Sequence, residues 1–153
     1  MDRFETRLRA GDNTFKELFR RYPYNPILTA KDWPYPVNTV FNPAAVMFEG
    51  KFLLLARVED RRGFSHLTKA VSEDGISNWN IDRAPTMESD PRHPEEKWGI
   101  EDPRIAHIPE LNQYAVVYTA YSKSGPAVCM ALTKNFVHFE RLGSVMPPED
   151  KDA

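Results

Sequence analysis

Short runs in which apolar and polar residues alternate occupy most of the chain after residue 38. Runs of about four to eight residues bounded by Gly, Asn, Asp and Pro are typical of β-strands. The pattern predicts strands within the segments 39–50, 51–59, 65–75, 78–82, 101–110, 112–125, 126–135 and 136–143. A polar, proline-rich insertion at 83–97 divides them into two groups, and the sequence as a whole predicts an all-β fold.

The two groups of predicted strands repeat one another in sequence. When they are aligned, Asn42-Pro43 falls on Asp102-Pro103, and the segment 50–60 falls on 112–122. About four strands in a unit of about 40 to 50 residues is typical of a β-propeller blade, although two unrelated meanders could align in this way by chance. We therefore predict blade-like units at about 38–82 and 100–143.

Two blades do not close a ring, because β-propellers have about four to eight blades. An open pair of blades would leave strand edges and an apolar side exposed to water. We therefore expect the segment 24–153 to be the N-terminal part of a larger propeller domain, or to be completed by partner chains.

An amphipathic helix is predicted ahead of this domain, within an N-terminal helical segment at 1–23. Phe15, Leu18, Phe19 and Tyr22 recur at helical spacing and form an apolar stripe. Such a stripe needs a surface to cover, either the main domain or a neighbouring subunit, so a homo-oligomer is one expectation. Four prolines between residues 22 and 38 exclude a regular helix there and indicate an extended connector.

Charge and cysteine content narrow the class of protein. The 20 basic and 22 acidic residues are mixed along the chain, so no nucleic-acid partner is expected. The start of the chain lacks the apolar stretch of a signal peptide, and the apolar runs are too short to span a bilayer, so we expect a cytoplasmic protein with no membrane partner. Cys129 is the only cysteine and the four histidines lie in separate segments, so neither an intrachain disulfide nor a metal site is expected.

The stretch WGIEDPRI, residues 98–105, places charged residues around a proline at the entrance of a predicted strand. Asn42 and Asp102 each precede a proline at the start of a blade's first strand, which in a propeller faces one mouth of the central channel. Both side chains should therefore reach the same funnel. In a regular strand Glu101 and Asp102 would point to opposite faces and could not form a close carboxylate pair. The alternative for Asp102 is a turn residue that bonds its own backbone.

The stretches NPAAVMFEGKFLLLARVEDRRGFSHL, WGIEDPRI, YTAYS and ALTKNFVHFERLG resemble glycoside hydrolase family 130, the inverting β-mannoside phosphorylases and their hydrolytic relatives. The resemblance extends from residue 24 to the last residue and implies a five-bladed β-propeller longer than this chain. It implies that Asp102 is the general acid, and that Asn42 and Arg57 bind the mannosyl unit at the bond that is broken. Asp60 and Arg104 match motif positions that would support the site.

The resemblance also implies the reaction. The mannosyl unit of substrates such as mannosyl-glucose or β-1,4-manno-oligosaccharides would pass to inorganic phosphate, giving α-mannose 1-phosphate with no cofactor. Phosphate attacks directly, so no general base is needed, whereas an inverting hydrolase needs a second carboxyl group to activate water. Asp102 would protonate the glycosidic oxygen, directly or through a mannose hydroxyl, and we expect its pKa to be raised for this task.

Phosphate binding requires cations, and here the sequence departs from the family. Phosphorylases of the family carry an Arg in the strand after YTAYS, where this chain has Ala127 and Val128. Arg141 is the remaining candidate for a phosphate ligand. A β-mannoside hydrolase, a five-bladed furanosidase-type glycosidase and an inactive truncated sugar-binding propeller fragment stay open as alternatives. Trp33 and Trp98 are candidates for stacking on a sugar ring.

Overall fold

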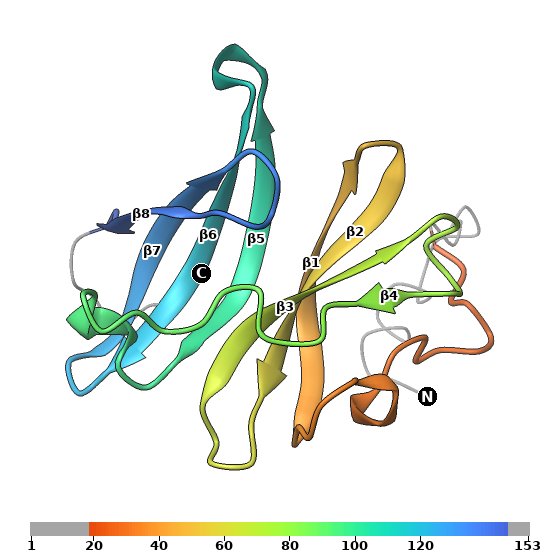
Figure 1. Cartoon of the computed structure of the whole chain (residues 1–153), viewed down its shortest axis with the longest axis horizontal. Coiled ribbons are helices and arrows are strands. Elements are labelled where there is room, and N and C mark those ends of the chain that lie inside the picture. The colour runs from red at the N-terminus through yellow and green to blue at the C-terminus, as the bar shows by residue number, and fades with distance from the viewer. Residues whose placement is uncertain (1–18, 147–153) are drawn as a thin grey trace, which may run out of the picture.

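The computed structural model describes residues 19–146, which form two four-stranded antiparallel sheets side by side (Figure 1). The first sheet contains, in order, β1 (Thr39–Phe48), β2 (Lys51–Glu59), β3 (Ser65–Ser72) and β4 (Asn80–Ile81). The second contains β5 (Ile100–Ile108), β6 (Gln113–Ser122), β7 (Gly125–Thr133) and β8 (Glu140–Ser144). Each strand pairs with its neighbour in sequence, as in a β-propeller blade, so the predicted all-β fold is confirmed.

Short 3-10 helices occur in the segments that connect the strands. They are η1 (Ala30–Asp32) in the connector before β1, η2 (Pro94–Glu96) in the insertion between the sheets, and η3 (Pro109–Leu111) between β5 and β6. The insertion at 83–97 is otherwise irregular, as its proline content predicts. It carries the chain from the outer edge of the first sheet back to the inner edge of the second.

The internal repeat extends to the turns that follow the third strand of each sheet. Ser72 Oγ accepts a hydrogen bond from the backbone N–H of Asp74, and Thr133 Oγ1 accepts one from the backbone N–H of Asn135, both at 3.3 Å. Hydroxyl and carboxamide side chains favour such turns because their oxygens replace a backbone acceptor. The repeat seen in the sequence is therefore also a repeat of structure.

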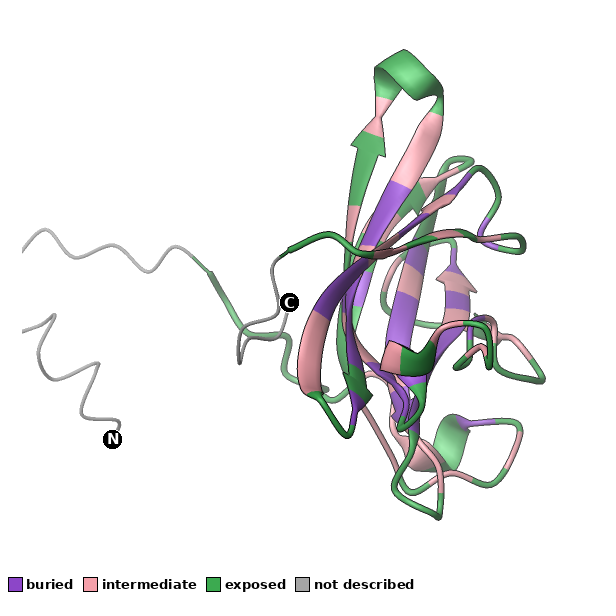
Figure 2. Ribbon diagram, turned by 90° about the vertical axis from the view of Figure 1, so that its left-hand side faces the viewer, coloured by how far each residue is buried: buried purple, intermediate pink, exposed green. Residues whose placement is uncertain are grey.

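The main hydrophobic core lies between the two sheets, and the buried residues lie mainly on the strands (Figure 2). Its fully buried side chains come from both of them: Leu53, Leu55 and Leu67 from the first sheet, and Ile100, Val116 and Tyr118 from the second. Burial of apolar surface favours this packing by about 25 cal/mol per Å². The sheets therefore pack face to face, as neighbouring blades do, and their inner strands β1 and β5 contact one another.

A second, smaller core covers the other face of the first sheet. Trp33 is buried there with Ala56 and Val58 of β2, and the connector residues Leu28 and Tyr35 pack against them. The proline-rich segment before β1 is thus an extended connector lined with aromatic side chains, as the sequence predicts. Its role is to cover a sheet face that would otherwise be exposed.

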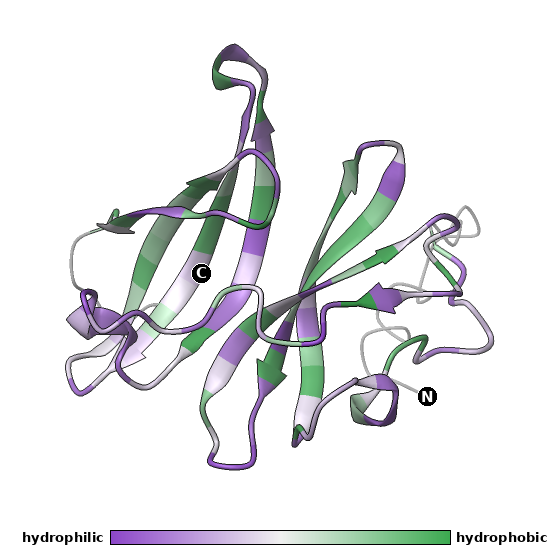
Figure 3. Ribbon diagram, in the orientation of Figure 1, coloured by the Kyte–Doolittle hydropathy of each residue, from purple (hydrophilic) through white to green (hydrophobic). Residues whose placement is uncertain are grey.

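The predicted N-terminal helix lies mainly outside the described residues, which begin at Phe19. The described part of that prediction, residues 19–22, is irregular and not helical, and the Phe19 side chain is largely exposed. Apolar residues are concentrated on the strands and polar residues in the loops between them (Figure 3). Within residues 19–146, no helix is long and apolar enough to cross a membrane.

Candidate active site

The inner strand of each sheet is distorted at the residue that precedes its proline. The β1–β2 register shifts between Phe41 and Ala44, and the β5–β6 register shifts between Glu101 and Arg104. Asn42 and Asp102 have backbone φ angles of 42° and 47°, which non-glycine residues rarely adopt. Bulges of this kind redirect a side chain out of the regular alternation and are common beside active sites.

The two bulges direct Asn42 and Asp102 toward each other across the junction of the sheets. The amide nitrogen of Asn42 donates hydrogen bonds to both carboxylate oxygens of Asp102, at 3.0 and 3.1 Å. Arg57 of β2 donates from Nη1 to Asp102 Oδ1 at 2.9 Å. The structure thus brings three of the predicted site residues together, and the Asp102 carboxylate is held by side chains of the first sheet.

Arg57 is itself held from several sides. Its Nε donates to Ser65 Oγ at 3.0 Å, its Nη2 lies 2.9 Å from Glu101 Oε1, and its guanidinium carbon lies 4.4 Å from the centre of the Phe41 ring. One guanidinium therefore joins the carboxylates of Glu101 and Asp102. The expectation that these two side chains point to opposite faces applied to a regular strand, and the bulge between Glu101 and Arg104 removes that condition.

The ionisation of Asp102 differs from the sequence expectation. Burial pushes the pKa of Asp102 upward, but hydrogen bonds from Asn42 and Arg57 and the positive charges of Arg57 and Arg104 outweigh this effect. The pKa of Asp102 consequently lies below the ordinary value of an aspartate. In this state of the protein Asp102 is a carboxylate at neutral pH, and a role as an acid requires that its surroundings change.

The other two residues that the motif suggested, Arg104 and Asp60, make mainly local contacts with the backbone. Arg104 donates from Nη1 to the backbone oxygens of Asp102 and Pro103, at 3.3 and 2.9 Å, so its side chain braces the bulge. Asp60 Oδ1 accepts hydrogen bonds from the backbone N–H groups of Arg62 and Phe64, which closes the loop between β2 and β3. Their roles in supporting the site stay predictions.

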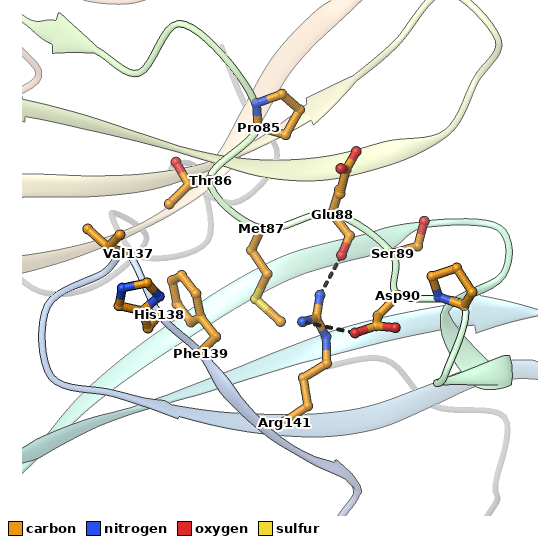
Figure 4. A pocket seen from close by; sticks show the side chains of 11 residues that line it. Pro85, Thr86, Met87, Glu88, Ser89, Asp90, Val137, His138, Phe139 and Arg141 are labelled. Atoms are coloured by element: carbon orange, nitrogen blue, oxygen red, sulfur yellow. Dashed lines mark hydrogen bonds and ion pairs between the residues drawn. The ribbon is translucent and has the colours of Figure 1, made fainter.

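Arg141 lies elsewhere, in a pocket of about 510 Å³ between the insertion and the chain that leads into β8 (Figure 4). Its Nε donates to Glu96 Oε1 at 3.0 Å, its Nη1 lies 3.8 Å from Asp90 Oδ2, and its Nη2 donates to the backbone oxygen of Glu88. Glu96 is fully buried and also accepts a hydrogen bond from the Tyr118 hydroxyl at 2.6 Å. The structure does not bring Arg141 to the Asp102 cluster, and its role in binding phosphate stays a prediction.

The structure adds residues that the sequence did not single out. Ser65 fixes Arg57, and nothing in its local sequence indicates this, because the two residues meet only when β2 pairs with β3. Gly99 packs on the backbone of Ser65, where a Cβ atom at residue 99 would lie 2.7 Å from the Ser65 carbonyl oxygen. Its φ of 118° also favours glycine. In the sequence, the glycine at position 99, two residues before EDPR, is the feature that could have indicated this close contact.

The two tryptophans proposed for sugar stacking differ in accessibility. Trp33 is 7% exposed and belongs to the smaller core, whereas Trp98 is 37% exposed and packs against Tyr121. Across the described residues 19–146, no group of three His, Cys, Asp or Glu side chains is placed to hold a metal ion.

Comparisons with known sequences point to one family. The profile of glycoside hydrolase family 130, described as β-1,4-mannooligosaccharide phosphorylase, matches residues 16–152. A 1,2-β-oligomannan phosphorylase of Thermoanaerobacter sp. (strain X514) is 33% identical over 147 residues, covering 88% of this chain and 47% of that protein. The chain spans about half the length of the curated relatives it matches.

Comparisons with solved structures agree with this result. One structure, from a study of family 130 glycoside hydrolases that target β-1,2 mannosidic linkages in Candida mannan, is 28% identical with a TM-score of 0.68, covering 82% of this chain and 40% of that one. The β-1,2-mannobiose phosphorylase from Listeria innocua has a TM-score of 0.72 at 22% identity, over 84% of this chain and 52% of that one, and this likeness concerns the fold. The two sheets correspond to about two blades of a five-bladed β-propeller.

Proposed function

Because the chain belongs to glycoside hydrolase family 130, we propose that its two sheets carry the general-acid part of a β-mannoside phosphorylase site. The observation that supports this proposal is the convergence of Asn42, Arg57 and Asp102 at the junction of the sheets. Asp102 would act as the acid, while Asn42 and Arg57 would bind the mannosyl unit. Arg104 and Asp60 would hold the backbone on which these side chains stand.

The reaction that suits this arrangement is an inverting displacement. An oxygen of inorganic phosphate attacks the anomeric carbon of the mannosyl unit from the face opposite the glycosidic oxygen. The bond from the anomeric carbon to that oxygen breaks, and the oxygen takes a proton from Asp102, directly or through a mannose hydroxyl. The products are α-mannose 1-phosphate and the released sugar. Phosphate is already an anion, so the reaction needs no second carboxyl group as a base.

The hydrogen bonds of the cluster suggest how Asp102 becomes an acid. In the free protein, Asn42 and Arg57 stabilise its carboxylate form. Sugar hydroxyls that bind Asn42 and Arg57 would withdraw these donors from Asp102, and a phosphate dianion nearby would add negative charge. Both changes raise the pKa of a carboxyl group. We therefore expect Asp102 to be ionised when the site is empty and protonated when substrate and phosphate are bound.

For the linkage, we propose β-1,2-linked mannosides as the first substrates to test, ahead of β-1,4-linked mannosides and mannosyl-glucose. The matched phosphorylase from Thermoanaerobacter is described as acting on 1,2-β-oligomannan. The family profile is described by a β-1,4 activity, so both linkages belong in the test.

Hydrolysis is the second candidate function, and the charge of the described residues favours it in one respect. Arg141 is paired with Glu96 and Asp90, and Arg57 is paired with Glu101 and Asp102. Positive charge that is already neutralised in this way binds phosphate weakly, because the anion must displace a carboxylate. A hydrolase would need no phosphate ligands.

The product of the complete gene separates these candidates when it is incubated with β-1,2-mannobiose, β-1,4-mannobiose and mannosyl-glucose, with and without phosphate. We expect α-mannose 1-phosphate to form, and to form only when phosphate is present. Free mannose released at a rate independent of phosphate would replace the phosphorylase with a hydrolase. Absence of release from all three sugars would contradict both the phosphorylase and the hydrolase.

A further inference from the structure

Two exposed aromatic side chains form a ring pair at the end of the second sheet where β5 begins and β6 ends, the lower end in Figure 1. The ring centres of Trp98 and Tyr121 are 5.6 Å apart, and the ring planes are tilted by 58°. The residues are 37% and 40% exposed. Because the two sheets form only about two blades of a five-bladed propeller, this exposure alone indicates no function, and the informative feature is the position of the pair beside the Arg57 cluster.

The backbone beneath the pair is fixed. The Trp98 N–H donates to the Tyr121 carbonyl oxygen at 2.7 Å, and the Tyr121 N–H donates to the Gly99 carbonyl oxygen at 3.0 Å. Gly99 in turn packs on Ser65, the residue that also fixes Arg57. The ring pair and the Arg57 guanidinium are therefore positioned by the same contact between the sheets.

The ring pair lies close along the sheet to the cluster formed by Arg57, Glu101 and Asp102. Glu101 pairs directly with Thr119 across β5 and β6, so their side chains share a face. Tyr121 is two residues beyond Thr119 on the same strand and lies on that same face, about 7 Å further along. Glu101 binds Arg57, and Arg57 binds Asp102, so a sugar on the ring pair would adjoin the proposed site of cleavage.

We propose that Trp98 and Tyr121 bind the sugar that is released, on the far side of the broken bond from the mannosyl unit. The apolar face of a pyranose matches the face of an aromatic ring, while its hydroxyl groups stay in water. Asn42 and Arg57 have polar side chains that suit the hydroxyl groups of the mannosyl unit. The aromatic pair suits the released sugar, which is bonded to the mannosyl unit before cleavage. This inference rests on the proposed function, because it takes Asp102 as the point at which the bond is broken.

The reverse reaction tests the inference, because it separates the two sugar sites. In it, α-mannose 1-phosphate and a mannose acceptor give mannobiose and phosphate. We expect Trp98→Ala and Tyr121→Ala each to raise the KM for the acceptor by about three- to tenfold, the loss that corresponds to one aromatic contact. The KM for α-mannose 1-phosphate should stay within about twofold. Trp98→Phe, which keeps a ring, should restore most of the acceptor affinity.

Tyr24→Ala is the matched control. Tyr24 also belongs to an exposed ring pair, with Tyr22 at 5.5 Å, but on the connector and far from β5 in sequence. We expect it to change neither KM. An unchanged acceptor KM in Trp98→Ala and Tyr121→Ala would overturn the inference, and so would an equal rise in both KM values.

A binding measurement keeps the inference testable if the protein proves to have no phosphorylase activity. β-1,2-Mannobiose is titrated by calorimetry into Asp102→Asn and into Asp102→Asn with Trp98→Ala. Weaker binding to the double variant supports the ring pair as a sugar site even if the proposed reaction fails. Equal affinity for both, or no binding to either, overturns it.

Discussion

At the scale of single residues, the central feature is one guanidinium shared by two carboxylates. Arg57 binds Glu101 and Asp102 at 2.9 Å each, and the three side chains are 16 to 24% exposed. A neighbouring carboxylate raises the pKa of a carboxyl group, whereas a neighbouring cation lowers it. We therefore expect Glu101 to oppose the effect of Arg57 on Asp102, both through its own charge and by occupying part of the guanidinium.

Glu101→Gln is expected to lower the pKa of Asp102 further. The variant loses a negative charge near Asp102, and the Arg57 guanidinium then pairs with Asp102 as its one carboxylate in the cluster. A general acid works in its protonated form, so activity declines as the pH rises past the pKa of the acid. The alkaline limb of the profile of kcat against pH, which reports the acid in the complex with substrate, should move to lower pH, and kcat at neutral pH should fall by roughly threefold to tenfold.

Glu59→Gln is the control for this prediction. Glu59 ends β2 and binds the amide of Asn38, but it does not belong to the Arg57 cluster. Its pH profile should match that of the wild-type protein. A fall in the rate of Glu101→Gln with an unmoved alkaline limb would show that Glu101 acts on the structure and not on the acidity of Asp102.

At the scale of elements, the site depends on irregularities in strands that are otherwise regular. The eight strands follow from alternating apolar residues and could be predicted closely from the sequence. The bulges at Asn42 and Asp102 could not, because a proline in a strand indicates an irregularity without stating its geometry. The pairing of Glu96 with Arg141 could not be predicted from the sequence either, since these residues are 45 positions apart and meet only through the packing of the insertion on β8.

Gly99 offers a test of how β5 is joined to the first sheet. An alanine at this position would adopt a strained φ of 118° and would place its Cβ atom 2.7 Å from the Ser65 carbonyl oxygen. We expect Gly99→Ala to lower the free energy of unfolding by more than about 2 kcal/mol. Gly63→Ala has a similar φ of 86° but open space around it, and should cost only about 1 kcal/mol. Chemical denaturation measures both, and equal losses would contradict a close contact at Gly99.

The buried pair of Glu96 and Arg141 is expected to stabilise the insertion. Arg141→Leu leaves the fully buried Glu96 carboxylate without its counter-ion, which should lower the free energy of unfolding by about 3 kcal/mol. The double variant Glu96→Leu with Arg141→Leu should recover part of this loss, because no unpaired charge remains. A stable Arg141→Leu variant with a raised KM for phosphate would instead support phosphate binding by Arg141.

At the scale of the whole molecule, the two sheets form one unit because they share a core, and the site is built across their junction. Asn42 comes from the first sheet and Asp102 from the second, so their hydrogen bond exists only when the sheets are packed together. The site therefore requires the fold of both blades, which explains why the sequence could suggest the residues but not their contacts.

Leu67→Ala tests the shared core. Leu67 is fully buried between the sheets, and its truncation should lower the free energy of unfolding by about 2 to 5 kcal/mol. Leu111→Ala, at a 54% exposed position in the turn between β5 and β6, should change it by less than about 0.5 kcal/mol. Comparable losses in the two variants, measured by urea denaturation, would show that the sheets are not joined through this core.

The role of Asp102 as the general acid is tested most directly by Asp102→Asn with two substrates that differ in their need for a proton. The leaving group of β-1,2-mannobiose must be protonated, whereas that of 2,4-dinitrophenyl β-mannoside departs without a proton. With phosphate present, we predict that the variant loses about 10²- to 10⁴-fold in rate on mannobiose and much less on the dinitrophenyl mannoside. An equal loss on both substrates, or no loss on mannobiose, would contradict the assignment of Asp102 as the acid.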